Sequence, residues 1–181
     1  IGNAAAALAT LASLRHRLPV PPDAIRAGLA RVRLPGRFQI VPGPVEWILD
    51  VAHNPHGAAV LAANLRARPC FGRTRAILGM LADKDASGVI RVLSDVVDDW
   101  HPVTLAGPRG RTGTELATTL RAAGVEPTAS GNNILDACRA ARAAAHPGDR
   151  IVVLGSFHTV APVLAARPWF FDIPPPHSRE A

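Results

Sequence analysis

Titratable and polar side chains follow three apolar runs of this sequence. Asp50 and His53 follow the first run, in "WILDVAHNPHG", and Lys84 follows the second, in "GMLADKD". Ser156 and His158 follow the third, in "VVLGSFHTV". Carboxylates, imidazoles and hydroxyls accept or donate hydrogen bonds, and a lysine ammonium neutralises an anion. If the three runs are parallel strands, their carboxyl ends meet at one edge of a sheet, and we expect these side chains to share a site there.

Arg37 and the loop after Asp50 have the chemistry to bind a phosphorylated ligand. The Asn54-Pro55 pair ends the strand and starts a helix, whose first backbone N–H groups are unpaired and attract anions. Asp50 could accept hydrogen bonds from sugar hydroxyls, and His53 could donate to a phosphate oxygen. Arg37 follows a Pro-Gly turn, and its guanidinium fork matches two phosphate oxygens.

Each of these residues also has a purely structural interpretation. Asp50 would cap its loop, Arg37 would lie on the surface, and Lys84 would pair with a neighbouring aspartate. His53 and His56 have a spacing that metal ligands use, but no third ligand is evident. The segment "GSFH" lacks the G-x-S-x-G frame of a hydrolase nucleophile. The spacing alone leaves these interpretations open.

The composition is that of a globular protein with one sizeable domain. A chain of 181 residues that is 48% hydrophobic can bury one good core. No apolar run reaches the roughly 18 residues needed to cross a bilayer. Cys70 and Cys138 form no C-x-x-C pair, which argues against a disulfide framework or a zinc site and fits a reducing cytoplasm. Because the chain begins with Ile1, we interpret it as a fragment of a longer protein.

The charge pattern and the glycine motifs remove some classes of function. The net charge of +6 comes from arginines spread over nearly every segment, with Lys84 the single lysine. We attribute the arginine content to the codon bias of a GC-rich genome and not, in the first place, to a basic binding face. Aromatic residues make up only 4% of the chain and tyrosine is absent, which argues against stacking on nucleic-acid bases. The chain has no G-x-x-x-x-G-K-[ST] loop, and "GPRGRTG" does not have the spacing of G-x-G-x-x-G.

Alternating helical and strand patterns predict an α/β fold. We expect a Rossmann-like, mostly parallel sheet flanked by helices, with a hairpin-like strand pair at its N-terminal end. The expected helices are 3–17 with Asn3 as its cap, 23–31, 56–68, 86–97, 114–123 with Thr114 as its cap, 132–145 and 156–166. The expected strands are 38–42, 45–51, 74–80, 101–106, 125–129 and 150–155.

Four ordered motifs carry a resemblance to a known family. "LPGRFQ", "ILDVAHNPH", "GMLADKD" and "GSFHTVA" resemble the C-terminal domain of bacterial folylpolyglutamate synthase/dihydrofolate synthase, in the Mur-ligase superfamily. "NAAAALATL" and "AIRAGLARVRLPGR" are similar to the end of that family's central domain and its linker. The resemblance implies three parts: the end of a central ATPase domain with linker helices at 1–33, a C-terminal α/β domain at 34–170, and a loose tail at 171–181.

The resemblance also implies an activity. Such enzymes are cytoplasmic, usually monomeric ligases that use ATP and Mg²⁺ to convert a carboxylate of dihydropteroate or folate into an acyl phosphate, which the amino group of L-glutamate then attacks. The phosphate-binding loop and the magnesium ligands belong to the N-terminal and central domains. We therefore expect no catalytic residue and no metal site within this chain, and no activity from it alone.

Residue roles follow from the same resemblance. It implies that four residues bind the nucleotide. Asn3 would lie near the adenine and Arg37 would reach the phosphates. Asp50 would contact the ribose and His53 the terminal phosphate. It places Lys84, Ser156 and His158 on the side of glutamate or folate. Two other functions, both without catalysis, are also compatible with the sequence. One is a Rossmann-like interaction module and the other is a basic module that binds polyanions.

Overall fold

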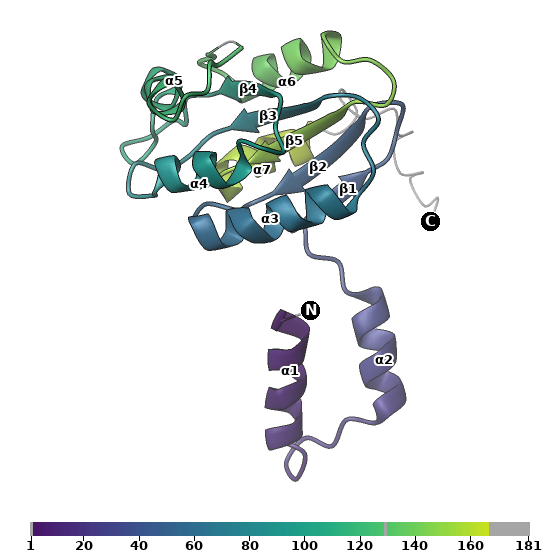
Figure 1. The fold of residues 1–181 in the computed structure, drawn as a ribbon. Coiled ribbons are helices and arrows are strands. Elements are labelled where there is room, and N and C mark those ends of the chain that lie inside the picture. Colours follow the sequence, from purple (N-terminus) through teal and green to yellow (C-terminus); the bar gives the residue numbers. More distant parts are fainter. Residues whose placement is uncertain (1, 129, 167–181) are drawn as a thin grey trace, which may run out of the picture. The chain divides into compact units, whose positions relative to one another are not determined.

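The computed structural model describes residues 2–128 and 130–166, and the chain divides into two units. The N-terminal unit is Ile1–Leu34 and the larger unit is Pro35–Ala181 (Figure 1). The predicted tail at 171–181 lies outside the described residues. That the first 33 residues belong to a separate ATPase domain remains a prediction.

The N-terminal unit consists of two helices, α1 (Gly2–Ser13) and α2 (Pro22–Arg31). A proline at the first position suits α2, because the N–H that proline lacks has no partner inside a helix at that position. Helix α1 begins at Gly2, so Asn3 lies in the first turn and is not the predicted cap. None of the side chains described in residues 3–34 is buried, so these two helices form no core of their own.

The larger unit contains a five-stranded sheet in the order β1-β2-β5-β3-β4. Its elements are β1 (Gln39–Val41), β2 (Glu46–Asp50), α3 (Pro55–Ala67), β3 (Thr74–Leu78), α4 (Ala86–Leu93), β4 (Asp99–Pro102), α5 (Gly113–Ala122), α6 (Ile134–Ala143), β5 (Arg150–Leu154) and α7 (Phe157–Ala165). Strand β1 pairs antiparallel with β2, and all other pairings are parallel. The predicted α/β class, the mostly parallel sheet and the N-terminal strand pair are therefore confirmed.

Helices cover both faces of this sheet (Figure 1). One core joins α3, α4 and α5 to one face through residues such as Leu61, Ile90 and Leu116. A second core joins α6 and α7 to the other face through Cys138 and Val163. Every position of β3 and β5 is buried, as expected for central parallel strands with helices on both sides.

The strand predicted at 125–129 is wrong for the four of its residues that the structure describes. Residues 125–128 contain Pro127, which cannot donate to a sheet ladder. The segment follows the edge strand β4 only through single bonds, such as Thr128 N to Trp100 O at 2.8 Å. The preceding strand also ends earlier than predicted, at Pro102 and not at 106.

Helix α5 has a different N-cap from the predicted Thr114. Thr112 is the cap: its hydroxyl accepts from Glu115 N, and Glu115 Oε2 accepts from Thr112 N at 2.7 Å. This reciprocal pair needs a spacing of three residues, which Thr112 has and Thr114 lacks.

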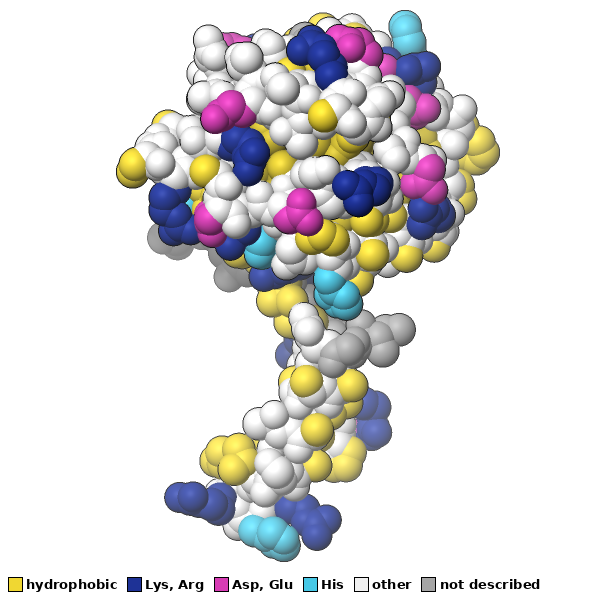
Figure 2. Space-filling view, turned by 60° about the vertical axis from the view of Figure 1, so that its left-hand side comes forward, with side chains coloured by type: hydrophobic (Ala, Val, Ile, Leu, Met, Phe, Trp, Pro, Cys, Tyr) yellow, Lys and Arg dark blue, Asp and Glu magenta, His cyan; other side chains and the backbone are white. Residues whose placement is uncertain are grey.

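The surface of the larger unit carries charges of both signs. On the face shown in Figure 2, Lys and Arg side chains lie among Asp and Glu side chains over this unit. No helix within the described residues is long and apolar enough to cross a membrane.

Candidate functional site

A pocket of about 250 Å³ lies at the carboxyl ends of β2, β3 and β5. Its lining residues come from the loops after these strands and from the loop after β4: His53, Leu81, Lys84, Arg109, Gly155, Ser156, Phe157 and His158. Four residues singled out from the sequence, His53, Lys84, Ser156 and His158, therefore meet in one pocket.

His53 is held by its own loop. Its Nδ1 lies 2.9 Å from Val51 O, and because a carbonyl only accepts, Nδ1 carries the proton. This leaves Nε2 for a ligand: it accepts when the ring is neutral and donates when the ring is charged. Asn54 caps α3 by accepting from Gly57 N at 2.8 Å, so the loop and the helix start are fixed together.

Lys84 shares a carboxylate with Arg109. Lys84 Nζ lies 2.9 Å from Asp83 Oδ2, and Arg109 Nη2 lies 3.3 Å from Asp83 Oδ1. Hydrogen bonds from Lys84 and Arg109 lower the pKa of Asp83 to about 2. The Asp83 carboxylate thus holds two cations side by side. Together the three side chains keep one net positive charge, which can attract an anion.

Two loops that carry these cations are joined by their backbones. Ala82 N donates to Arg109 O at 2.8 Å, and Arg111 N donates to Met80 O at 3.0 Å. Arg111 Nη2 adds bonds to Ala82 O and Lys84 O, at 2.9 and 3.2 Å. The loop after β3 and the loop after β4 therefore form one paired double loop, residues 79–85 with 105–112.

Ser156 is committed to the start of α7. It is buried, and its hydroxyl accepts from Thr159 N and lies 2.9 Å from Thr159 Oγ1. Thr159 Oγ1 in turn donates to Gly79 O at 2.6 Å, which ties α7 to the end of β3. His158, in contrast, is exposed and free to turn toward a ligand.

Asp50 holds the backbone that presents Arg37. Its Oδ2 accepts from Phe38 N and its Oδ1 from Ala52 N, both at 2.7 Å. Burial raises the pKa of Asp50, although the two backbone N–H groups and the Arg37 charge oppose that rise. The capping interpretation therefore describes the contacts of Asp50, and its free lone pairs remain available to a hydroxyl.

Arg37 lies at the rim of the pocket. Its side chain is exposed, and its guanidinium carbon lies 5.6 Å from the ring centroid of Phe157, a pocket residue. Arg37 contacts the pocket through Phe157 and His53 lines it, whereas Asp50 does not line it and bonds to the backbone beside Arg37. Whether they bind a nucleotide remains a prediction.

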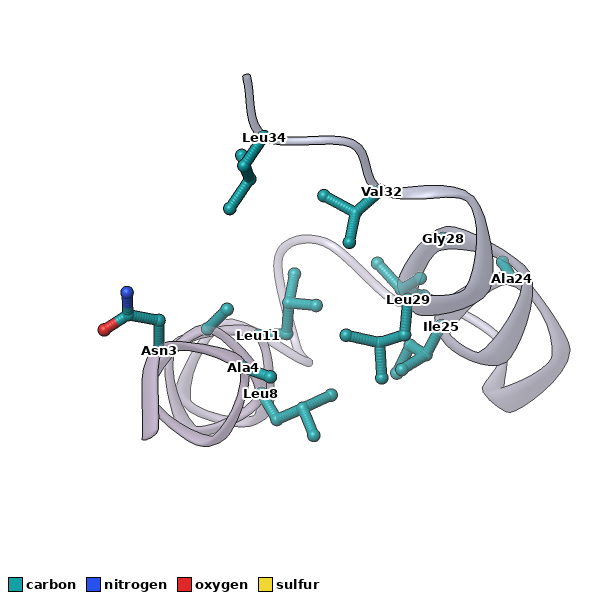
Figure 3. A pocket seen from close by; sticks show the side chains of 12 residues that line it. Asn3, Ala4, Leu8, Leu11, Ala24, Ile25, Gly28, Leu29, Val32 and Leu34 are labelled. Carbon is teal, nitrogen blue, oxygen red and sulfur yellow. The ribbon is translucent and has the colours of Figure 1, made fainter. Parts of the chain in front are cut away.

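Asn3 belongs to the N-terminal unit. It lies at the edge of an apolar groove of about 440 Å³ between α1 and α2, where Leu8, Leu11 and Leu29 point inward (Figure 3). Its predicted role near an adenine stays a prediction.

Sequence reasoning missed four of the lining residues, Leu81, Arg109, Gly155 and Phe157, of which Arg109 is charged and Phe157 is aromatic. The strand-end rule places the predicted site residues after β2, β3 and β5 and leaves out β4. Applied to β4, it leads to the loop "AGPRGRTG", which carries Arg109. Phe157 gave no signal, because an apolar residue between Ser156 and His158 is expected to pack in a core.

The donors present suit phosphate or carboxylate. Lys84 and Arg109 supply charge, His53 and His158 supply ring nitrogens, and Arg37 supplies a planar fork at the rim. Among residues 2–128 and 130–166, no cluster of three His, Cys, Asp or Glu side chains could hold a metal ion. We therefore assign no step to a metal held by these residues.

Comparison with known proteins gives consistent results. The domain family "Mur ligase, glutamate ligase domain" matches residues 36–157. The dihydrofolate synthase/folylpolyglutamate synthase of Escherichia coli K12 is 46% identical over 162 residues, which are 90% of this chain and 37% of that protein. The structure of E. coli FolC in complex with DHPP and ADP has a TM-score of 0.83 and 45% identity, over 92% of this chain and 38% of that one.

A further structure contains three other ligands. It is a bifunctional folylpolyglutamate synthase/dihydrofolate synthase with Mn, AMPPNP and L-glutamate bound. It has a TM-score of 0.75 and 44% identity, over 84% of this chain and 36% of that one. The present chain thus spans less than half the length of the relatives it matches.

Proposed function

The chain belongs to the Mur ligase family through its glutamate ligase domain, and from this premise we propose that it serves an ATP-dependent ligase which joins L-glutamate to dihydropteroate or folate. It is homologous to the bacterial dihydrofolate synthase/folylpolyglutamate synthases. The ligase would act through an acyl phosphate. This chain would contribute the side of the site that contacts nucleotide phosphates and the incoming amino acid.

One observation carries the proposal. Lys84 and Arg109 lie on one carboxylate in the same pocket as His53, and Arg37 stands at its rim. Phosphoryl transfer depends on preorganised positive charge and hydrogen-bond donors more than on covalent chemistry by the protein. A pocket with cations fixed by ion pairs and by backbone bonds supplies that preorganisation.

The roles of the pocket residues follow from their contacts. Arg37 would bind phosphate oxygens through its fork, and His53 would bind a terminal phosphate through Nε2. Asp50 would accept from a ribose hydroxyl while it holds the backbone beside Arg37. Lys84 and Arg109 would bind a carboxylate of L-glutamate, with His158 at the open side and Ser156 fixing the start of α7.

Other parts of the reaction are proposed to lie elsewhere. The chain has no phosphate-binding loop, and its described residues offer no metal cluster. We place the phosphate loop and the Mg²⁺ ligands in the part of the longer relatives that this chain does not match. We propose that the complete enzyme is a monomer and acts in the cytoplasm.

Ligand titration by NMR tests this proposal. L-glutamate and ADP, added separately to the ¹⁵N-labelled chain, should shift the amide signals of 53–57, 81–85, 109–111 and 155–158, with affinities in the millimolar range. Lys84→Met should weaken L-glutamate binding about tenfold, the loss of roughly 1.4 kcal/mol for one partly exposed charged hydrogen bond.

Arg66→Met is the matched control. Arg66 pairs with Asp95 on the exposed surface at 2.5 Å, and neither residue lines the pocket. Its loss should leave both affinities unchanged. No shift at the pocket with either ligand would refute the proposal and favour the interaction module. Shifts spread over surface arginines and abolished by salt would favour the polyanion-binding module.

A further inference from the structure

Phe157 is an aromatic side chain without a place in either core. It sits in the first turn of α7, lines the pocket and is 57% exposed. Its neighbours in the chain, Ser156 and His158, are polar. Removing so large an apolar surface from water would favour folding, so its exposure needs an explanation other than packing.

The backbone on both sides of Arg37 is fixed in the left-handed region. Gly36 has a φ of +69° and Phe38, which is not glycine, has a φ of +45°. Such a conformation in a bulky residue costs roughly 1–3 kcal/mol and persists only where other contacts enforce it. Here Val51 N donates to Gly36 O at 2.8 Å, and Phe38 N donates to Asp50 at 2.7 Å.

These contacts fix the Cα of Arg37 but not its long side chain. Within the described part of the chain, its guanidinium makes no ion pair and no hydrogen bond that would hold it. The contact that does reach it is the Phe157 ring, 5.6 Å from the guanidinium carbon. That distance is within the range of a cation–π interaction.

We propose that Phe157 is a positioning residue, which holds the guanidinium of Arg37 at the rim of the pocket while leaving it free to bind an anion. A carboxylate in this place would occupy the N–H donors and cancel the charge, as Asp83 partly does for Lys84 and Arg109. An aromatic face attracts the same cation and leaves its five N–H donors open. The inference rests on the proposed function only in naming a phosphate as what Arg37 binds.

The test has a readout that does not depend on binding. In the 181-residue chain, the Nε–Hε signal of Arg37 is assigned by its disappearance in Arg37→Lys. The ring of Phe157 should shift this signal upfield. Phe157→Leu, which keeps the apolar bulk, should return it to the range of a free arginine, and Phe157→Tyr should preserve the shift.

A titration with inorganic tripolyphosphate supplies the second readout. Phe157→Leu should weaken binding about 2- to 5-fold, the loss of an exposed cation–π contact, and Phe157→Tyr should restore it. Phe71→Leu is the control, because Phe71 is 95% exposed and does not line the pocket. It should change neither readout.

The outcomes separate this inference from the proposed function. An Arg37 signal that is unaltered in Phe157→Leu would overturn the inference, as would equal losses of affinity in the leucine and tyrosine variants. If no variant bound tripolyphosphate but the Arg37 signal still followed the ring, the positioning role would stand and the phosphate site would fall.

Discussion

Asp50→Asn should destabilise the larger unit, because an amide cannot replace the carboxylate that holds this turn. Each carboxylate oxygen accepts one backbone N–H, from Phe38 and from Ala52, both at 2.7 Å. Asparagine has one acceptor oxygen, so its NH₂ group would face the second N–H. A hydrogen bond to a charged group contributes about 1.5–3 kcal/mol, and an orphaned N–H costs about 1–3 kcal/mol.

Burial reduces this loss. It raises the pKa of Asp50, which means that the ionised carboxylate is disfavoured by its surroundings, and a neutral amide avoids that cost. The strain at Phe38, with its φ of +45°, would also be relieved if the turn opened. We therefore expect a net loss of about 1–3 kcal/mol in the free energy of unfolding, within the range of the two contributions above.

Urea denaturation at neutral pH, followed by tryptophan fluorescence, measures this loss. Trp47 and Trp100 are buried in the two cores, so their emission reports on the larger unit. Asp95→Asn is the control, because its exposed ion pair with Arg66 should contribute about 0–1 kcal/mol. If Asp50→Asn lost no more stability than Asp95→Asn, the conclusion that the Asp50 carboxylate holds the turn at Arg37 would be wrong.

Three further predictions concern the Asp83 carboxyl, the glycine after β5 and the activity of the chain. The Asp83 carboxyl should titrate at about 2 by ¹³C NMR, so its stabilising charge is present above the ordinary value of 3.8 and is lost as the pH falls through 2; Lys84→Met should raise this pKa. Gly155→Ala should cost more than about 3 kcal/mol or prevent folding, because Gly155 has a φ of +114° and an added Cβ would collide with Gly79 O; Gly124→Ala, with a φ of +77° but open space, should cost about 1–2 kcal/mol by urea denaturation. The 181-residue chain with ATP, L-glutamate and dihydropteroate should release no phosphate above background, because it has no phosphate-binding loop; turnover by the purified chain would contradict this.

The class of fold was predictable because burial on both faces leaves a strong pattern. The run "RIVVL" has no polar residue after its first position, and it is the strand between β2 and β3 in the sheet. The end of β4 was not predictable in the same way. Beyond Pro102, where β4 ends, the residues at 103, 105 and 106 are still apolar and Val103 N still donates to Leu78 O, so hydrophobicity alone extends the predicted strand to 106.

The site was partly predictable for a related reason. Strand ends identify the loops that meet at one edge of a parallel sheet, and His53 and Lys84 were found by that rule. Which atoms are already occupied depends on tertiary contacts that no spacing encodes. The commitment of Thr159 to Gly79 O and that of Asp50 to Phe38 N are of this kind.

The double loop formed by residues 79–85 and 105–112 sets a rule for chimeras of this domain. Arg111 donates to the carbonyls of Ala82 and Lys84, and its own backbone pairs with Met80. Transplanting only one of the two loops from a ligase with another amino-acid preference would leave the Arg111 guanidinium without its carbonyl partners and would misplace Lys84. A graft intended to change selectivity has to exchange both segments together, as a single cassette.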